Sequence, residues 1–97
     1  MALRKLWSLA TRHSGSRFEQ LLEPHVDGLY RMAYRFCGNR DDAEDLVQDL
    51  LIKLYPRTDE VAALDNPKPW LARVLYRMYI DRTRRSTRSA LEQADND

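Results

Sequence analysis

Apolar residues recur along this chain at spacings of three and four residues, which is the period of one face of an α-helix. Three such stripes can be followed in the sequence, and alternation with a period of two does not compete with them. Their members are Phe18, Leu21, Leu22, Val26, Leu29, Ala33 and Phe36; Ala43, Leu46, Val47, Leu50, Leu51 and Leu54; and Leu71, Val74, Leu75, Met78 and Tyr79. The pattern therefore predicts an all-α fold, a compact bundle of three to four helices.

Glycine, asparagine and proline set the expected ends of the first two helices. The first is expected from residue 18 to residue 36 or 37, and Pro24 either kinks it or splits it into a short turn and a second helix. The next helix is expected from residue 39 or 40 to the residues before Pro56. Residues 56–66 then form a connection that is long for a small helical domain, and long ordered loops are often functional.

A last helix is expected to open with Asn66 as its cap, to carry Pro67 and Pro69 in its first turn, and to end near Arg85. The chain is thus expected to divide into three parts. These are a variable basic N-terminal helix over residues 1–15, a helical domain over residues 16–86, and a flexible linker or tail over residues 87–97.

Composition excludes several classes of protein. Ninety-seven residues, of which 43% are hydrophobic and 32% charged, suit one soluble domain and neither a disordered tail nor a membrane protein. The single cysteine, Cys37, excludes an intramolecular disulfide and a cysteine-based zinc site, and the expected compartment is a reducing cytoplasm. No secretory signal pattern, Gly-rich phosphate loop, Ser/His/Asp set or metal-ligand cluster is found, so we expect no enzyme, no cofactor and no metal.

The formal net charge of +1 hides a strong segregation of charge along the chain. Residues 1–17 carry +4, residues 18–66 carry −6, residues 67–90 carry +6 and residues 91–97 carry −3. A chain sorted in this way can present an acidic surface to one partner and a basic surface to another. The basic surface would suit a polyanion.

One polar stripe lies opposite the apolar face of the helix that is expected to end before Pro56. It consists of Asp41, Asp45, Gln48, Asp49 and Ile52. A continuous stripe of charge, amide and one apolar contact is typical of a surface on which a partner helix docks. The alternative is that the aspartates merely solvate the helix and that Ile52 is an ordinary exposed apolar residue.

The last helix carries a basic row opposite its apolar side. Arg73, Arg77 and Arg84 project within about 40° of each other. Trp70, Tyr76, Ile80 and Arg88 flank this row, and Asp81 is expected to pair with Arg84 and Arg85. Guanidinium groups beside aromatic rings suit single-stranded or opened nucleic acid, because they bind phosphates while the rings stack on bases. The alternative is a solvated basic face whose aromatic residues are tucked into the edge of the core.

Three blocks in order carry a family resemblance. The first combines residues 18–22 with 29–33, and the second is residues 42–49, Asp-Ala-Glu-Asp-Leu-Val-Gln-Asp. The third begins with residues 66–71, Asn-Pro-Lys-Pro-Trp-Leu, and continues to Arg84 and Arg85. Together these blocks, over 68 of the 97 residues, resemble the second conserved region of bacterial extracytoplasmic-function (ECF) sigma factors.

This resemblance implies two partners. Asp45, Gln48 and Asp49 match the positions at which the family contacts the β′ coiled coil of core RNA polymerase, with Asp41 and Ile52 on the same stripe. The last helix and the loop before it would recognise the promoter −10 element, help to melt it and hold flipped non-template bases. Residues 57–66 would shape the base pocket, and the DNA-binding residues would be Asn66, Lys68, Trp70, Arg73, Tyr76, Arg77, Ile80, Arg84 and Arg85.

The chain also departs from the family pattern. Arg77 stands where the family usually has an asparagine, and Tyr79 where it has a small residue, so base preference cannot be transferred. The helix-turn-helix domain that reads the −35 element is missing from the sequence, which is expected of either a fragment or a short protein. An anti-sigma factor is a further partner that the family allows. A helical protein-interaction module without DNA contact is the competing function.

Overall fold

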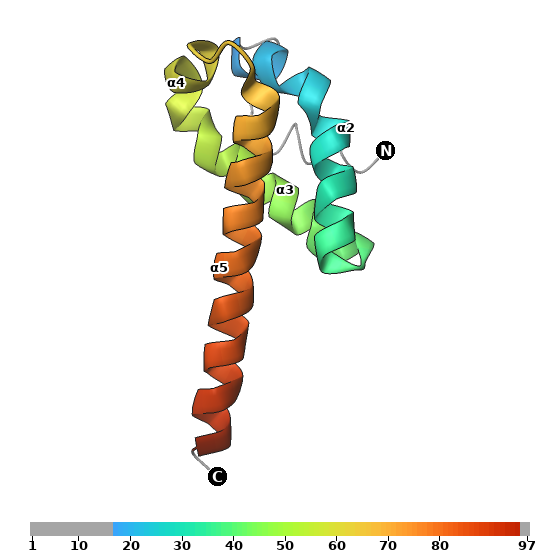
Figure 1. The fold of residues 1–97 in the computed structure, drawn as a ribbon, viewed down its shortest axis with the longest axis vertical. Coiled ribbons are helices and arrows are strands. Elements are labelled where there is room, and N and C mark those ends of the chain that lie inside the picture. Colours follow the sequence, from blue (N-terminus) through green and yellow to red (C-terminus); the bar gives the residue numbers. More distant parts are fainter. Residues whose placement is uncertain (1–16, 96–97) are drawn as a thin grey trace.

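The computed structural model describes residues 17–95, and their side chains except at 89, 90 and 92–95. Its elements are α2 (Arg17–Cys37), α3 (Arg40–Leu54), the 3-10 helix η1 (Tyr55–Arg57), α4 (Thr58–Ala62) and α5 (Pro67–Asp95). Within this range there is no strand, and the predicted all-α fold is confirmed (Figure 1). The helix expected at the N-terminus lies outside the described residues. None of the described helices is long and apolar enough to span a membrane.

Helix α2 runs without interruption through Pro24. It bends in its first third, which Figure 1 shows as a change of direction between the blue and the cyan turns. Proline removes one backbone hydrogen bond and crowds the preceding turn, which is the usual cause of such a bend. Of the two readings of Pro24 offered by the sequence, the kinked helix is therefore the one that the structure adopts.

The junction between α2 and α3 is built from two residues. Gly38 has a φ of +77°, a conformation that glycine adopts without steric cost, and its amide donates to the Tyr34 carbonyl at 2.8 Å. Asn39 is the N-cap of α3: its Oδ1 accepts from the Asp42 amide at 2.9 Å, and its Nδ2 donates to Asp42 Oδ2 at 2.8 Å. The expected boundary at Gly38 and Asn39 is confirmed.

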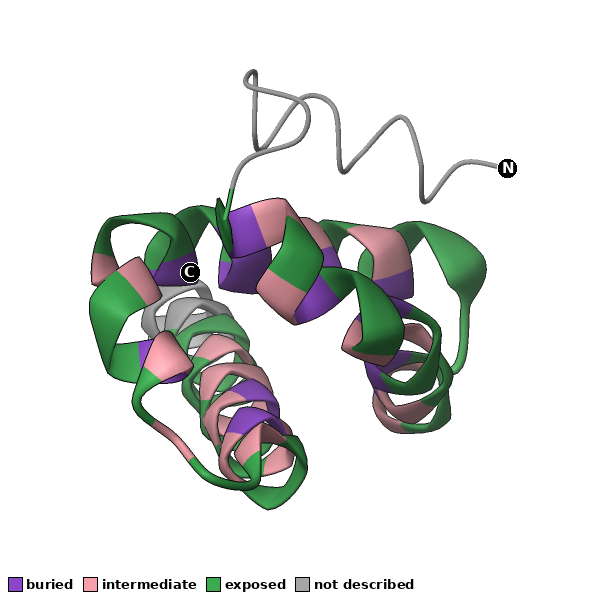
Figure 2. Cartoon of the chain, turned by 90° about the horizontal axis from the view of Figure 1, so that it is seen from above, coloured by how far each residue is buried: buried purple, intermediate pink, exposed green. Residues whose placement is uncertain are grey.

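The core forms where α2, α3 and α5 pack against one another. All six residues of the predicted apolar stripe of α3 are buried. Leu71 and Leu75 meet them from α5, and Phe18 and Leu22 from α2. Viewed along α5, the buried residues turn toward the space between the helices and the exposed ones turn outward (Figure 2). Burial of these stripes is the main force that holds the helices together.

The prediction that residues 56–66 form a loop is wrong for most of these residues. Residues 55–57 form η1 and residues 58–62 form α4. Val61 is buried and anchors α4 on the core, while Asp59 and Glu60 lie in its first turn, where acidic side chains are favoured. A buried single residue gives no periodic signal, so the sequence pattern could not reveal so short a helix.

Helix α5 begins at Pro67, directly after Asn66 as expected, but departs from expectation at its other end. It continues to Asp95 instead of ending near Arg85, and no proline or glycine interrupts it after Pro69. Thr83 and Thr87 donate to the carbonyls of Tyr79 and Thr83, which accommodates their hydroxyls within the helix. At its start, Asn66 makes no side-chain hydrogen bond to any described residue. A cap accepts from the second or third amide of the helix, and the third residue here is a proline without an N–H.

Candidate functional site

The acidic stripe of α3 consists of Asp41, Asp45, Gln48, Asp49 and Ile52, as the sequence predicted. The three aspartates are exposed, Gln48 is half-buried, and Ile52 keeps 51% of its surface exposed. The stripe lies on the side of α3 that faces away from its six buried residues. The stripe is therefore exposed on the outside of the domain, where a partner could contact it. Its role in binding stays a prediction.

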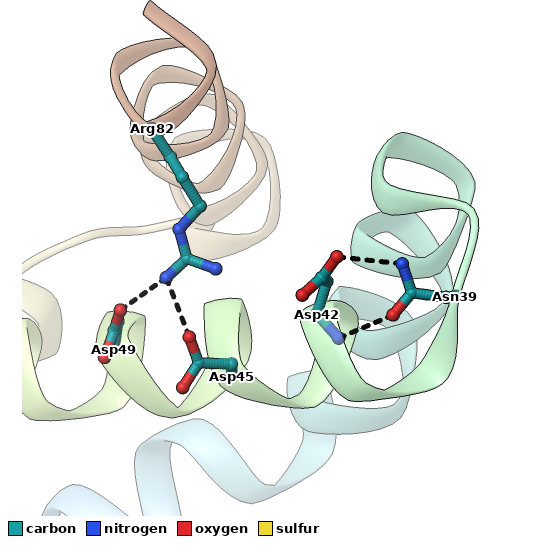
Figure 3. A network of polar contacts seen from close by, with 5 residues as sticks. All are labelled: Asn39, Asp42, Asp45, Asp49 and Arg82. Atoms are coloured by element: carbon teal, nitrogen blue, oxygen red, sulfur yellow. Dashed lines mark hydrogen bonds and ion pairs between the residues drawn. The ribbon is translucent and has the colours of Figure 1, made fainter. Parts of the chain in front are cut away.

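A residue that sequence reasoning missed, Arg82 of α5, reaches this stripe (Figure 3). Its Nη2 lies 2.5 Å from Asp49 Oδ2 and 3.3 Å from Asp45 Oδ2. Only 33% of the Arg82 side chain is exposed, against 61% for Asp45 and 48% for Asp49. One guanidinium therefore bridges two carboxylates that stand one helical turn apart.

The bridge changes what the stripe offers to a partner. Asp45 and Asp49 are four residues apart, where like charges repel, and Arg82 offsets that repulsion. Each carboxylate still exposes an oxygen that is not held by Arg82 in these ion pairs. The bridge thus fixes the two side chains and leaves them able to accept hydrogen bonds from a basic partner.

Arg82 was recognisable in retrospect. Leu71, Leu75, Met78 and Arg82 follow one another at spacings of four, three and four residues, so Arg82 occupies the next position of the core-facing stripe of α5. An arginine at a core-facing position is partly removed from water, which favours an acidic partner on a neighbouring helix. The sequence alone did not show which helix that would be.

Arg82 also bears on Cys37 at the end of α2. Partial burial raises the pKa of the Cys37 thiol, the nearby Asp42 carboxylate raises it further, and the positive charge of Arg82 opposes both. The thiol is half-buried and free. It therefore has the character of a small structural side chain and lacks the lowered pKa of a reactive cysteine.

The basic row of α5 is taken from this point to include Arg85 as well as Arg73, Arg77 and Arg84, and all four side chains are exposed. No ion pair within the described part of the chain involves any of the four. The predicted pairing of Asp81 with Arg84 and Arg85 is therefore wrong: the three exposed side chains remain in solvent, where such a pair contributes little. The row keeps its full positive charge.

The aromatic residues beside the row differ in what they expose. Tyr76 is 52% exposed, and its ring packs edge-on against Phe36 with centroids 5.5 Å apart. Phe36 in turn stacks on Tyr79 at 5.1 Å. Trp70 is half-buried, and the Arg57 guanidinium carbon lies 5.7 Å from its ring centroid. Tyr76 is thus supported by Phe36 of α2 and open to solvent, while the guanidinium of Arg57 lies over the ring of Trp70.

The remaining predicted DNA-binding residues lie at the start of α5 and along its middle. Asn66 and Lys68 are exposed at the start of α5, and Ile80 is half-buried beside the row. Among residues 17–95 no group of three His, Cys, Asp or Glu side chains could hold a metal ion. The structure brings most of the predicted residues onto two surfaces, but Lys68 lines a hollow against α2 and Arg85 lines one against α3 beside Asp49. The contacts of all these residues with partners stay predictions.

Comparisons with known proteins agree on one family. The family described as Sigma-70 region 2 matches residues 21–89. The chain is 33% identical over 85 residues to the ECF RNA polymerase sigma factor SigE of Mycolicibacterium smegmatis, a match over 82% of this chain and 31% of that protein. It is 27% identical over 85 residues to the ECF RNA polymerase sigma factor SigW of Bacillus subtilis, over 88% of this chain and 46% of that protein.

The chain spans less than half the length of these curated relatives. No solved structure matches it. The matched residues extend from Leu21 of α2 into the last third of α5 and so include both surfaces. On this match over more than half of its length, the chain belongs to the Sigma-70 region 2 family and has ECF sigma factors among its relatives.

Proposed function

We propose that this domain acts in transcription initiation as the part of a sigma factor that binds core RNA polymerase and captures the opened promoter −10 element. The observation that carries the proposal is the placement of two oppositely charged surfaces on different helices. The acidic stripe is on α3 and the basic row on α5, and the core uses neither. Membership of the Sigma-70 region 2 family supports the same assignment.

The acidic stripe is assigned to the polymerase, with the β′ coiled coil as its partner. A helical partner fits because carboxylates, an amide and the apolar Ile52 follow one another at helical spacing. Opposite charges on the partner would steer its approach and fix its register. Because Arg82 holds Asp45 and Asp49 in place, these side chains lose little further freedom on binding.

The basic row is assigned to the separated non-template strand. Its four arginines take phosphates, and the exposed ring of Tyr76 stacks on an unpaired base, which contributes about 1 to 3 kcal/mol. Unstacking a base costs a few kcal/mol, so contacts made only with the opened strand favour opening. The domain performs no bond chemistry in this scheme.

The test of the strand-binding half is a salt titration with single-stranded decamers of −10 sequence. The four arginines of the row by themselves predict that log affinity falls with log salt at a slope of about −2.8, or about 0.7 per phosphate contact. A pull-down with core polymerase tests the other half. Retained polymerase binding without salt-sensitive binding to any decamer would reject strand capture and favour an interaction module that does not touch DNA.

An anti-sigma factor is the remaining partner in this proposal. Both surfaces are open in the described part of the chain, so an inhibitor that covers them would block polymerase and strand together. Competition between such a protein and core polymerase for the acidic stripe is the corresponding measurement.

A further inference from the structure

Arg57 belongs to η1, which comes before α4 in the sequence, yet its side chain lies against the first turn of α5. Its guanidinium carbon is 5.7 Å from the centroid of the Trp70 ring. Its Nη2 and Nε donate to one oxygen of Glu60, Oε2, at 2.7 and 3.1 Å. An aromatic ring and a carboxylate therefore hold this arginine in one position.

Helical geometry places this position in line with the row. Trp70 precedes Arg73, Arg77 and Arg84 by three, seven and fourteen residues, so all four side chains leave α5 within about 60° of one another. A guanidinium over Trp70 therefore extends the row beyond the first turn of the helix. The row gains a fifth arginine from a separate element.

Arg57 retains the capacity to bind an anion. A guanidinium has five N–H donors, of which Glu60 accepts two through a single oxygen. Nη1 has no hydrogen-bond partner within the described chain, and 41% of the side chain is exposed. A phosphate oxygen can thus be bound without breaking the pair with Glu60.

We propose that Arg57 is a further strand-binding residue, which takes a backbone phosphate of single-stranded nucleic acid while Trp70 supports its guanidinium instead of stacking on a base. This proposal rests on the proposed function of α5. It removes Trp70 from the base-stacking residues that the sequence predicted and makes the ring a support. Tyr76 is then the exposed ring left for a base on this face of the described chain.

The first test compares the salt dependence of decamer binding in the full chain and in Arg57→Ala. Five phosphate contacts predict a slope of about −3.5, and loss of one returns it to about −2.8, with several-fold weaker binding at low salt. The matched control is Arg40→Ala on α3, which also removes an arginine paired with a glutamate, at 2.9 Å, but one away from the row. Its slope is expected to stay unchanged.

Two charge variants separate a binding role from a structural one. Arg57→Lys keeps the positive charge and is expected to keep the slope. Glu60→Gln removes a negative charge beside the phosphate site and keeps a side-chain oxygen that can accept from Arg57, so it is expected to tighten binding several-fold. A purely structural Arg57 would leave the slope at its original value in Arg57→Ala, and that result would overturn the proposal. Circular dichroism of each variant checks that the helices are retained.

The emission of Trp70 tests its role as a support. In a Trp7→Phe background Trp70 is the single tryptophan of the chain. The proposal predicts little change in its emission when a decamer binds, because Arg57 stays over the ring; strong quenching would show a stacked base and overturn it. If the salt dependence became less steep in Arg77→Ala but stayed unchanged in Arg57→Ala, the proposal for Arg57 would be overturned while the proposed function of α5 would stand. Failure of the chain to bind any decamer would overturn the proposed function with it.

Discussion

At the scale of single residues, Arg82 joins the two helices that carry the candidate surfaces. It occupies a core-facing position of α5, where an apolar side chain would extend the stripe of Leu71, Leu75 and Met78. Instead it leaves the edge of the core and pairs with Asp45 and Asp49. Because all three side chains are partly exposed, solvent screens the pairs and limits what they contribute to stability.

Replacing Arg82 by alanine is therefore expected to lower the free energy of unfolding by about 1 kcal/mol or less at low salt, and by less at high salt. The measurement is urea denaturation at two salt concentrations. Arg77→Ala is the matched control, since it removes an exposed arginine of the same helix that pairs with no described carboxylate. Equal effects of the two variants at both salt concentrations would contradict a stabilising bridge.

Cys37 gives a pH-dependent prediction at the same scale. Only the thiolate reacts with iodoacetamide, and burial together with Asp42 raises the pKa of this thiol. The alkylation rate of the folded chain is therefore expected to reach half its maximum at a higher pH than that of the urea-unfolded chain. Arg82→Ala should move this midpoint still higher, because Arg82 lowers the pKa. A midpoint that shifts downward in this variant would contradict the assigned cause.

At the scale of elements, the turn between α2 and α3 depends on a left-handed glycine and a capping asparagine. Asn39→Ala removes the acceptor of the Asp42 amide and is expected to destabilise the chain by about 1 kcal/mol. Asn39→Ser keeps a capping oxygen and should retain most of the stability. Thermal unfolding of both variants measures the difference, and equal losses would show that the cap contributes nothing.

At the scale of the whole molecule, the two surfaces should be separable by mutation. Gln48→Ala with Ile52→Ala is expected to weaken core polymerase binding about tenfold or more while decamer binding is kept, because neither residue pairs with Arg82. Tyr76→Ala with Arg77→Ala is expected to do the reverse, with about 1 to 3 kcal/mol lost from the stacked base. Both affinities are measured for each double variant.

Two controls keep this comparison specific. Asp49→Ala removes a carboxylate of the stripe and also breaks the bridge, so its effect is compared with that of Arg82→Ala. Equal damage to both partners by either double variant, with the fold preserved, would contradict the division into two surfaces.

The helices and their buried faces followed from local sequence. A stripe at spacings of three and four predicts both a helix and its inner side, and the six buried residues of α3 confirm this. Local chemistry also ended α2 at Gly38 and began α3 after Asn39. The exposure of the acidic stripe and of the basic row follows from the same projection, because a side chain opposite the core has only solvent or a partner to face.

Tertiary structure decided which side chains meet. Arg82 finds Asp45 and Asp49 across 33 and more residues of sequence, and Arg57 finds Trp70 across thirteen. Such pairs depend on where helices cross and on how deep each lies, and the period of a single helix contains neither quantity. The short α4 and the continuation of α5 escaped the sequence for a related reason, since one buried valine and a polar helix leave no stripe to follow.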